Sequence, residues 1–312
     1  MRSAFVENTC LPVLLDAQNE DGGWGFHAGS ISRAEPTAWA VIALLECAFN
    51  PSHEEAASRG IRFLGAAQLP DGSWPSSPEW REGSWVTSLV CLALLGRSES
   101  SGSVKRGLDW LSKELPGEAG LFHRLVRLLA VRKSVAVQNL SYFGWCWTIG
   151  TASWVEPTSY AILSLRGNPS ELLPVAAMRR LRLGEAMLYD RMCPGGGWNC
   201  GNPMVYGVPG EPQVSSTVWA LLALRDHPER PEVQKSVQWL EENLKSIQSP
   251  GSLALALIAM NAYGRPDPAL ADSLRTMYEE KEILWNVPEV AWAGLALSGT
   301  QNWLQQKSNG NR

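Results

Sequence analysis

The chain has 312 residues, of which 45% are hydrophobic and 19% are charged, so it is long and apolar enough to bury a large core. A net charge of −4 argues against the basic surface that a nucleic-acid-binding protein needs. No apolar run reaches the length of about eighteen residues that spans a bilayer. The first residues lack a signal-peptide pattern, and the scattered Cys residues do not resemble a disulfide framework. We therefore expect a cytoplasmic protein.

Two kinds of predicted helix alternate along the chain. Amphipathic helices, each with one apolar stripe, are predicted at 8–18, 54–67, 103–113, 174–190, 231–246 and 267–280. Almost wholly apolar helices follow them at 36–48, 85–95, 157–166, 213–225, 251–263 and 288–298. One further helical pattern, at 119–133, has no place in this alternation.

A helix that is apolar on every side must be buried on every side. The apolar helices are therefore predicted to form an inner ring, and the amphipathic helices an outer ring around it. This arrangement is an all-α (α/α)6 toroid with a hollow, apolar centre. We expect one toroid domain over residues 1–300 and a C-terminal tail over residues 301–312.

A repeated phrase joins the two kinds of helix. Residues 18–24 read Gln-Asn-Glu-Asp-Gly-Gly-Trp, and residues 68–74 read Gln-Leu-Pro-Asp-Gly-Ser-Trp. A Thr opens an apolar helix thirteen positions after each Trp, at Thr37 and Thr87. The same interval separates Trp145 from Thr158, and a looser copy joins Trp198 to Thr217. Such a repeat indicates one structural unit used several times.

The phrase favours a structural role for its Gln, Gly and Trp residues. We expect the Gln side chain to hydrogen-bond the free N–H groups at the start of the next inner helix, with the indole stacked on the amide. Gly permits the tight turn that precedes the Trp.

The Gln-x-x-x-Gly-x-Trp elements, followed by apolar helices such as 215–224, resemble the repeats of squalene–hopene and oxidosqualene cyclases. Residues 207–217 are especially similar to a repeat of that family. The resemblance covers about residues 10 to 300 and implies the toroid fold. It indicates function less specifically, because protein prenyltransferase β subunits and complement thioester domains share this fold class.

The resemblance also implies where an acid would lie. These cyclases protonate an alkene through the middle Asp of an Asp-x-Asp-Asp-Thr motif that opens an inner helix. Here Glu35-Pro36-Thr37 and Glu156-Pro157-Thr158 place Glu35 and Glu156 at the middle position, and neither keeps the flanking Asp residues. Both are candidate catalytic acids, Glu156 first because its neighbourhood is richer in aromatic residues. Glu followed by Pro also suits the start of any helix, which leaves a structural role open.

Aromatic residues are the candidate lining of the central cavity, since their faces stabilise cations. The candidate substrate-binding residues are Trp39, Trp85, Tyr142, Trp145, Trp147, Trp154, Tyr160 and Trp219. They would equally suit an ordinary aromatic core. A carboxyl buried among them should have a raised pKa and keep its proton near neutral pH.

Other chemistries have little support in the sequence. Only four His residues are present and none has metal-ligand spacing to a Cys, so we expect no metal, and no organic cofactor is implied. The basic groups at 124–133 and at Arg179, Arg180 and Arg182 are interpreted as solvated helix faces.

The sequence thus predicts a terpene-cyclase-like enzyme, of the isomerase or lyase type, that acts on an apolar isoprenoid substrate by acid-initiated cyclisation or rearrangement. A peripheral membrane contact through an apolar patch is a further expectation. The alternative is a non-catalytic toroid that binds a lipid or a protein partner.

Overall fold

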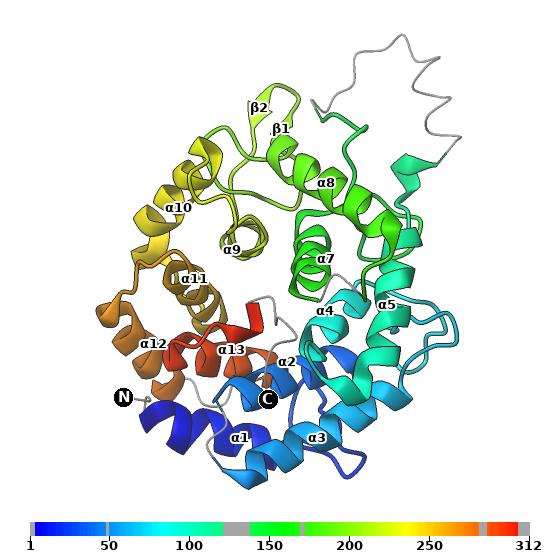
Figure 1. Cartoon of the computed structure of the whole chain (residues 1–312). Coiled ribbons are helices and arrows are strands. Elements are labelled where there is room, and N and C mark those ends of the chain that lie inside the picture. Colours follow the sequence, from blue (N-terminus) through cyan, green and yellow to red (C-terminus); the bar gives the residue numbers. More distant parts are fainter. Residues whose placement is uncertain (1–3, 48–49, 121–137, 169–171, 281–285, 305–312) are drawn as a thin grey trace.

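The chain folds into two concentric rings of helices, which the computed structural model shows in a view down their common axis (Figure 1). The structure describes residues 4–47, 50–120, 138–168, 172–280 and 286–304. Within these ranges the inner ring consists of α2 (Ala34–Cys47), α4 (Val86–Ala93), α7 (Val155–Gly167), α9 (Val214–Ala223), α11 (Pro250–Ala262) and α13 (Val287–Ser298). Each inner helix packs against the next, and α13 packs against α2, so the ring is closed.

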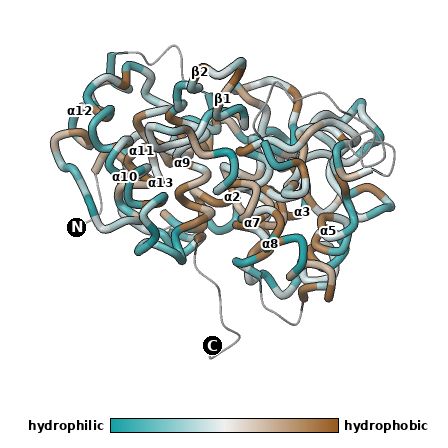
Figure 2. Tube along the Cα trace, turned by 90° about the horizontal axis from the view of Figure 1, so that it is seen from above, coloured by the Kyte–Doolittle hydropathy of each residue, from teal (hydrophilic) through white to brown (hydrophobic). Residues whose placement is uncertain are grey.

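The outer ring is amphipathic. In the described ranges it consists of α1 (Leu11–Asp16), α3 (Pro51–Ala66), α5 (Ser101–Lys113), α8 (Val175–Asp190), α10 (Pro231–Asn243) and α12 (Pro268–Glu280), with a π-helical turn at Val6–Cys10 before α1. Figure 2 shows hydrophobic colour on inner helices such as α9 and mostly hydrophilic colour on outer α12. The predicted (α/α)6 toroid is confirmed, because six inner and six outer helices alternate along the described chain.

Shorter elements connect the rings. A hairpin of β1 (Met204–Val205) and β2 (Val208–Pro209) precedes α9, and its turn residues Tyr206 and Gly207 have positive φ angles of 51° and 79°. Turns of 3₁₀ helix lie at Ser98–Ser100, Gly117–Ala119, Leu244–Ser246 and Asn302–Leu304. Residues 121–137, which hold most of the extra helix predicted at 119–133, lie outside the described residues.

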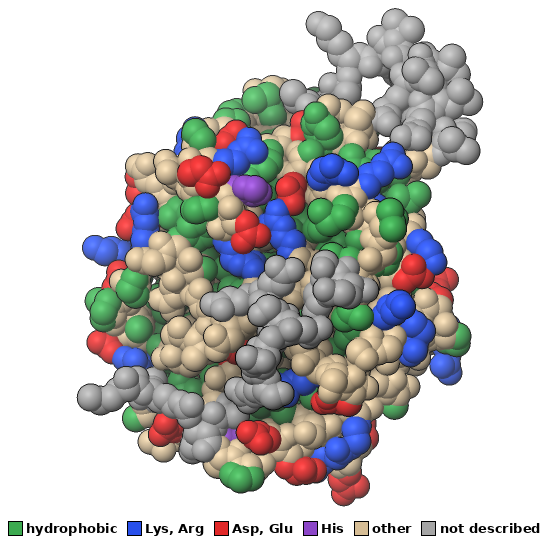
Figure 3. Space-filling model, in the orientation of Figure 1, with side chains coloured by type: hydrophobic (Ala, Val, Ile, Leu, Met, Phe, Trp, Pro, Cys, Tyr) green, Lys and Arg blue, Asp and Glu red, His purple; other side chains and the backbone are tan. Residues whose placement is uncertain are grey.

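Burial explains why the inner helices need no polar face. In α2, every residue from Ala34 to Leu44 except Glu35 is buried. Charged side chains of both signs are instead interspersed among the described residues on the face seen in Figure 3. Hydrophobic burial of the inner ring therefore dominates the stability of the fold.

Hydrogen bonds explain the interval between Trp and Thr. The backbone N–H of Trp24 donates to Thr37 Oγ1 at 2.8 Å, while its indole N–H donates to the carbonyl of Leu14 at 2.6 Å. The same backbone bond joins Trp74 to Thr87, Trp145 to Thr158 and Trp198 to Thr217. The last interval is longer because the β1–β2 hairpin is inserted within it. Each Trp thus ties the end of an outer helix to the start of the following inner helix.

The predicted partner of the repeated Gln is wrong. Gln18 Nε2 donates to the carbonyl oxygens of Gly22 and Ala56, at 2.8 and 2.9 Å, rather than meeting an N–H of the inner helix. Gln68 makes the equivalent pair of bonds, to Gly72 and Ser103. Because Ala56 belongs to α3 and Ser103 to α5, the amide links one outer helix to the next.

Gly22 is required by its backbone conformation. Its φ is +85°, and a Cβ at this position would lie 2.8 Å from the carbonyl oxygen of Arg59 in α3. Only glycine satisfies both conditions. The close approach of this turn to α3 is what brings the amide of Gln18 within reach of Ala56.

The end of the chain departs from the predicted tail. Trp303 and Leu304, in the turn Asn302–Leu304, are only 4% and 2% exposed. The turn packs against α2 and α7 of the inner ring. Residues 303 and 304, which were expected in the tail, are therefore buried in the core.

Candidate active site

The two predicted acids lie at the same end of the barrel. Glu35 and Glu156 occupy the first turns of α2 and α7, which are both inner helices. Since inner and outer helices alternate along the chain, the inner helices all begin at one end of the toroid. We call this the acidic end.

Glu35 is a half-buried carboxyl whose charged form is disfavoured. Burial raises its pKa to about 7, against the opposing effect of the nearby Arg33 guanidinium. A substantial fraction of Glu35 is therefore protonated at neutral pH. The raised pKa expected for a buried acid is found at this residue.

Glu156 is held by its neighbour on the ring. Ser216 Oγ, on α9, donates to Glu156 Oε1 at 3.1 Å. Both glutamates also lie within electrostatic reach of Tyr160: burial raises the pKa of the Tyr160 phenol well above its ordinary value, and the charges of Glu156 and Glu35 raise it further. The two acids, which are distant in sequence, thus both act electrostatically on one aromatic residue.

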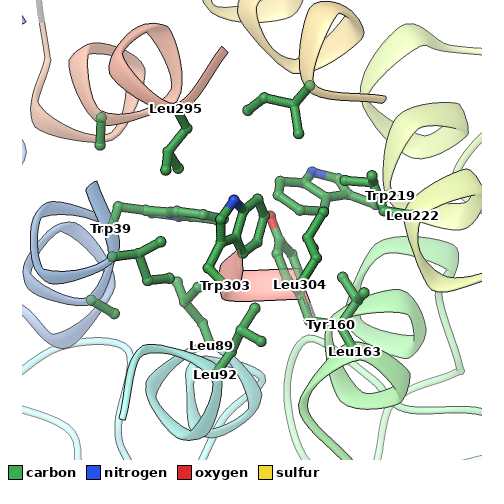
Figure 4. Packing of buried hydrophobic residues seen from close by; sticks show 14 of the residues in the cluster. Trp39, Leu89, Leu92, Tyr160, Leu163, Trp219, Leu222, Leu295, Trp303 and Leu304 are labelled. Carbon is green, nitrogen blue, oxygen red and sulfur yellow. The ribbon is translucent and has the colours of Figure 1, made fainter. Parts of the chain in front are cut away.

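Tyr160 belongs to a central aromatic cluster. Its ring centroid lies 4.5 Å from that of Trp219 and 5.1 Å from that of Trp85. Trp85 in turn lies 4.9 Å from Trp147, and Trp39 lies 5.4 Å from Trp219. Figure 4 shows Trp39, Tyr160 and Trp219 extending from α2, α7 and α9 toward the centre of the ring.

Two members of the cluster come from the last part of the chain. Trp292 of α13 and Trp303 have ring centroids 5.7 and 6.0 Å from that of Trp39. Neither was among the residues selected from the sequence. Trp292 lies on a predicted inner helix and could have been selected on that ground, whereas Trp303 lies in the predicted tail.

Three of the eight predicted lining residues lie outside the cluster. The indole N–H of Trp145 donates to the carbonyl of Leu111, and its ring lies 4.1 Å from the Arg180 guanidinium. Tyr142 is 39% exposed on a loop, and Trp154 is the half-buried residue before α7. We therefore retain Trp39, Trp85, Trp147, Tyr160 and Trp219.

The hollow centre expected from the sequence is not found among the described residues. Trp303 and Leu304 occupy the middle of the ring, as Figure 4 shows. A cavity beside Trp303 has a volume of about 40 Å³, and one between Trp85 and Glu114 has about 10 Å³, room for roughly one water molecule. Binding sites for small organic ligands usually occupy about 300–1,000 Å³. Both of these cavities are too small for a ligand of that size.

A buried ion pair lies next to Trp145, on the outer-helix side of the cluster. Glu114 and Arg180 form an ion pair at 4.0 Å, and both side chains are 5% exposed. Burial raises the pKa of Glu114, while the Cys146 thiol, whose Sγ donates to Glu114 Oε1 at 3.1 Å, and Arg180 oppose the shift. The prediction that Arg180 is solvated is wrong, because it lies on the inward side of α8. This pair joins the outer helices α5 and α8 beside the site.

Within the described ranges, His, Cys, Asp and Glu side chains do not gather in a group of three that could bind a metal ion. In the same ranges, each helix is too short or too polar to cross a membrane.

Sequence comparison gives a partial match. Residues 1–85, which include Glu35, match the family model of the squalene-hopene cyclase C-terminal domain. A drimenyl diphosphate synthase from Streptantibioticus cattleyicolor is 44% identical over 66 residues, which cover 21% of this chain and 12% of that protein. A lanosterol synthase from Aspergillus fumigatus is 32% identical over 82 residues, or 23% of this chain and 10% of that protein. The chain therefore aligns with only about a tenth of each of these curated relatives.

Structural comparison extends over most of the chain. A protein from Actinoplanes is similar with a TM-score of 0.61 and 16% identity, over 95% of this chain and 98% of its own. The type II terpene cyclase MstE from Scytonema has a TM-score of 0.55 and 16% identity, over 87% of this chain and 75% of its own. At these identities the likeness shows the fold. The resemblance is confirmed as a similarity: residues 1–85 are similar to the squalene-hopene cyclase C-terminal domain, and most of the chain has the same fold as the type II terpene cyclase MstE.

Proposed function

We propose that this protein is a terpene-cyclase-like enzyme that cyclises or rearranges an apolar isoprenoid substrate by acid catalysis. The observation that carries the proposal is Glu35, a carboxyl with a pKa of about 7 at the rim of the central aromatic cluster. The charges of Glu35 and Glu156 both act on Tyr160, a member of that cluster. A proton donor next to aromatic faces is what an alkene protonation requires.

The names of the relatives support this substrate class. One curated relative is named drimenyl diphosphate synthase and another lanosterol synthase. A variant of MstE from Scytonema has a structure in complex with geranylgeranyl dihydroxybenzoate, which is named as its substrate. The inner ring of this protein is apolar, so an isoprenoid chain would suit it as a ligand.

The proposed reaction begins with transfer of the Glu35 proton. The O–H bond of the carboxylic acid breaks, and the π pair of a terminal alkene forms the new C–H bond, which leaves a tertiary carbocation. A second alkene of the same chain attacks this cation and closes a ring. Loss of a proton from the final cation to a carboxylate, Glu35 or Glu156, forms the product alkene and balances the reaction.

The aromatic cluster would stabilise the cation during ring closure. Each ring face contributes about 0.5–2 kcal/mol, and more where water is excluded. Tyr160 and Trp219, whose centroids are 4.5 Å apart, are close enough to act on one cation together. Trp39 borders Trp219 on the other side.

We place Glu35 before Glu156 as the acid, which reverses the order suggested by the sequence. The raised pKa of Glu35 keeps a proton available at neutral pH. Glu156 accepts a hydrogen bond from Ser216. A raised pKa also makes Glu35 a weaker acid, so the aromatic cluster must supply much of the stabilisation of the cation.

Three further proposals concern the domain, the cellular compartment and a membrane contact. The toroid is one domain that includes the turn Asn302–Leu304. Free thiols at all six cysteines suit the cytoplasm. A peripheral membrane contact at the acidic end is supported by exposed apolar side chains on the loops that enter the inner helices: Ile31 at 65%, Trp80 at 55%, Ile149 at 44% and Tyr206 at 81%.

The filled centre favours one alternative, a non-catalytic toroid that binds a lipid or a protein partner. Trp303 and Leu304 occupy the space that a substrate would need. The two functions differ in whether a covalent product forms.

The test is product formation in deuterated water. Purified protein is incubated with geranylgeranyl dihydroxybenzoate and with unmodified prenyl alcohols, and the products are analysed by mass spectrometry. We expect a cyclised product that carries deuterium, formed by the wild type and lost in Glu35→Gln. Glu289→Gln is the matched control, since Glu289 also lies in the first turn of an inner helix with a pKa raised by burial. Substrate recovered unchanged from the wild type would leave only the binding function.

A further inference from the structure

The turn Asn302–Leu304 lies toward the end of the barrel opposite the acids. After α13 ends at Ser298, Gly299 adopts a φ of +67° and reverses the chain. The turn Asn302–Leu304 then enters the ring and places the Trp303 indole against Trp39, which lies near the middle of α2. Figure 4 shows Trp303 and Leu304 among the central side chains.

The contacts of this turn fix its location. The Arg225 guanidinium, just after α9, donates to the carbonyl of Leu304 and to that of Leu222. Gln301 Nε2 donates to the carbonyl of Ile258 in the C-terminal half of α11, at 3.5 Å. These partners all lie at the C-terminal ends of inner helices. Glu35 and Glu156 lie at the N-terminal ends, so a ligand that reaches the acids extends toward Trp303.

We propose that Trp303 determines how long an isoprenoid chain the centre accepts. The proposal rests on the function proposed above, and it assigns to this residue the closed end of the substrate site. A chain that enters at the acidic end must stop where the indole begins. A longer chain would have to displace the turn and break the hydrogen bonds from Arg225 to Leu304 and from Gln301 to Ile258.

The turn is held mainly by burial and by bonds to its backbone. The indole N–H of Trp303 is buried with no acceptor among the described residues, which costs free energy relative to a hydrated indole. The carbonyl bond from Arg225 to Leu304 does not involve the indole, whereas the packing on Trp39 does. Removing the indole should therefore extend the site without disturbing the inner ring.

The test compares two truncations that differ in residues 301–304, the turn and the preceding Gln301. One ends at Thr300 and lacks Trp303; the other ends at Leu304 and keeps it. Trp303→Ala in the full chain is the third variant, and circular dichroism verifies that each protein is folded. Binding of geraniol, farnesol, geranylgeraniol and squalene is measured by native mass spectrometry. Benzene, which occupies small apolar cavities, is tested separately by its effect on the melting temperature.

We expect the truncation at Thr300 and Trp303→Ala to bind a longer prenyl chain than the wild type does, with about tenfold tighter binding of that chain. The truncation at Leu304 should match the wild type. If all proteins share the same longest ligand, the proposal is overturned.

The benzene arm separates this proposal from the proposed function. If no protein binds any prenyl compound, the isoprenoid function fails, and the closure by Trp303 is judged by benzene alone. Stabilisation by benzene in the truncation at Thr300 but not in the truncation at Leu304 supports a closed end formed by the turn. Equal responses contradict it.

Discussion

Glu35 should make the stability of the protein depend on pH in a way that Glu35→Gln removes. Its pKa rises from an ordinary 4.5 to about 7 because burial disfavours the carboxylate. The folded protein therefore holds this proton over a pH range in which the unfolded chain releases it. The stability that the neutral carboxyl confers is fully present below pH 4.5 and is lost as the pH rises through 7.

The size of this effect follows from the pKa shift. One pKa unit corresponds to about 1.4 kcal/mol, so the shift corresponds to about 3 kcal/mol, of which about 2–3 kcal/mol falls between about pH 5 and pH 8. Over that interval the free energy of unfolding of the wild type should fall by this amount relative to Glu35→Gln.

Urea unfolding at the two pH values measures the difference directly. Taking the difference between wild type and variant cancels the contributions of other titrating groups. Glu82→Gln removes an exposed carboxyl and is the control for a change in net charge. Parallel pH profiles for the wild type and Glu35→Gln would refute the reasoning, because they would show that the carboxyl is not desolvated.

Two further predictions concern the framework of the site. Thr37→Val keeps the shape of a fully buried side chain but leaves the backbone N–H of Trp24 without its acceptor. This change should lower the free energy of unfolding by about 1–3 kcal/mol, measured by urea unfolding. The control is Thr276→Val on the exposed side of α12, which should change stability by less than about 0.5 kcal/mol. Arg180→Met leaves the buried Glu114 carboxylate without its ion-pair partner and should lower the free energy of unfolding by about 3–5 kcal/mol near neutral pH. The loss should be smaller under acidic conditions, where Glu114 is protonated. A loss of stability that does not depend on pH would contradict this account.

The architecture could be predicted because it depends on local patterns. The almost wholly apolar helix that contains Trp39 has no polar face to expose, whereas the helix that contains Val233, Val237 and Leu240 has one apolar stripe. Alternation of the two kinds leaves a double ring as the simplest packing. The interval between Trp24 and Thr37 is also local, since one hydrogen bond spans it.

Contacts between distant segments could not be predicted in the same way. The acceptor for Gln18 is Ala56, which depends on where α3 passes the turn, and no pattern near Gln18 encodes that position. Arg180 stands between two exposed arginines on α8, and only the three-dimensional packing shows that it alone faces inward toward Glu114.

The candidate site could be predicted only in part, because some of its residues follow from local patterns and others come from distant segments. Glu35 and Glu156 follow from their place at the start of inner helices, and Tyr160 and Trp219 follow from being aromatic residues on those helices. The Trp303–Leu304 pair lies in a polar segment without periodicity, so the sequence offered no signal that it returns to the centre. That return is also why the hollow centre expected from the sequence is not found among the described residues.

The central claim is that Glu35 holds a proton at neutral pH beside the aromatic cluster. Carbon-13 NMR of protein labelled at the glutamate carboxyls measures this directly, with the signal of Glu35 assigned by its absence from Glu35→Gln. The account predicts a carboxyl that titrates with a midpoint near pH 7. A midpoint close to the ordinary glutamate value of 4.5 would contradict it, since Glu35 would then be ionised and unable to donate a proton at neutral pH.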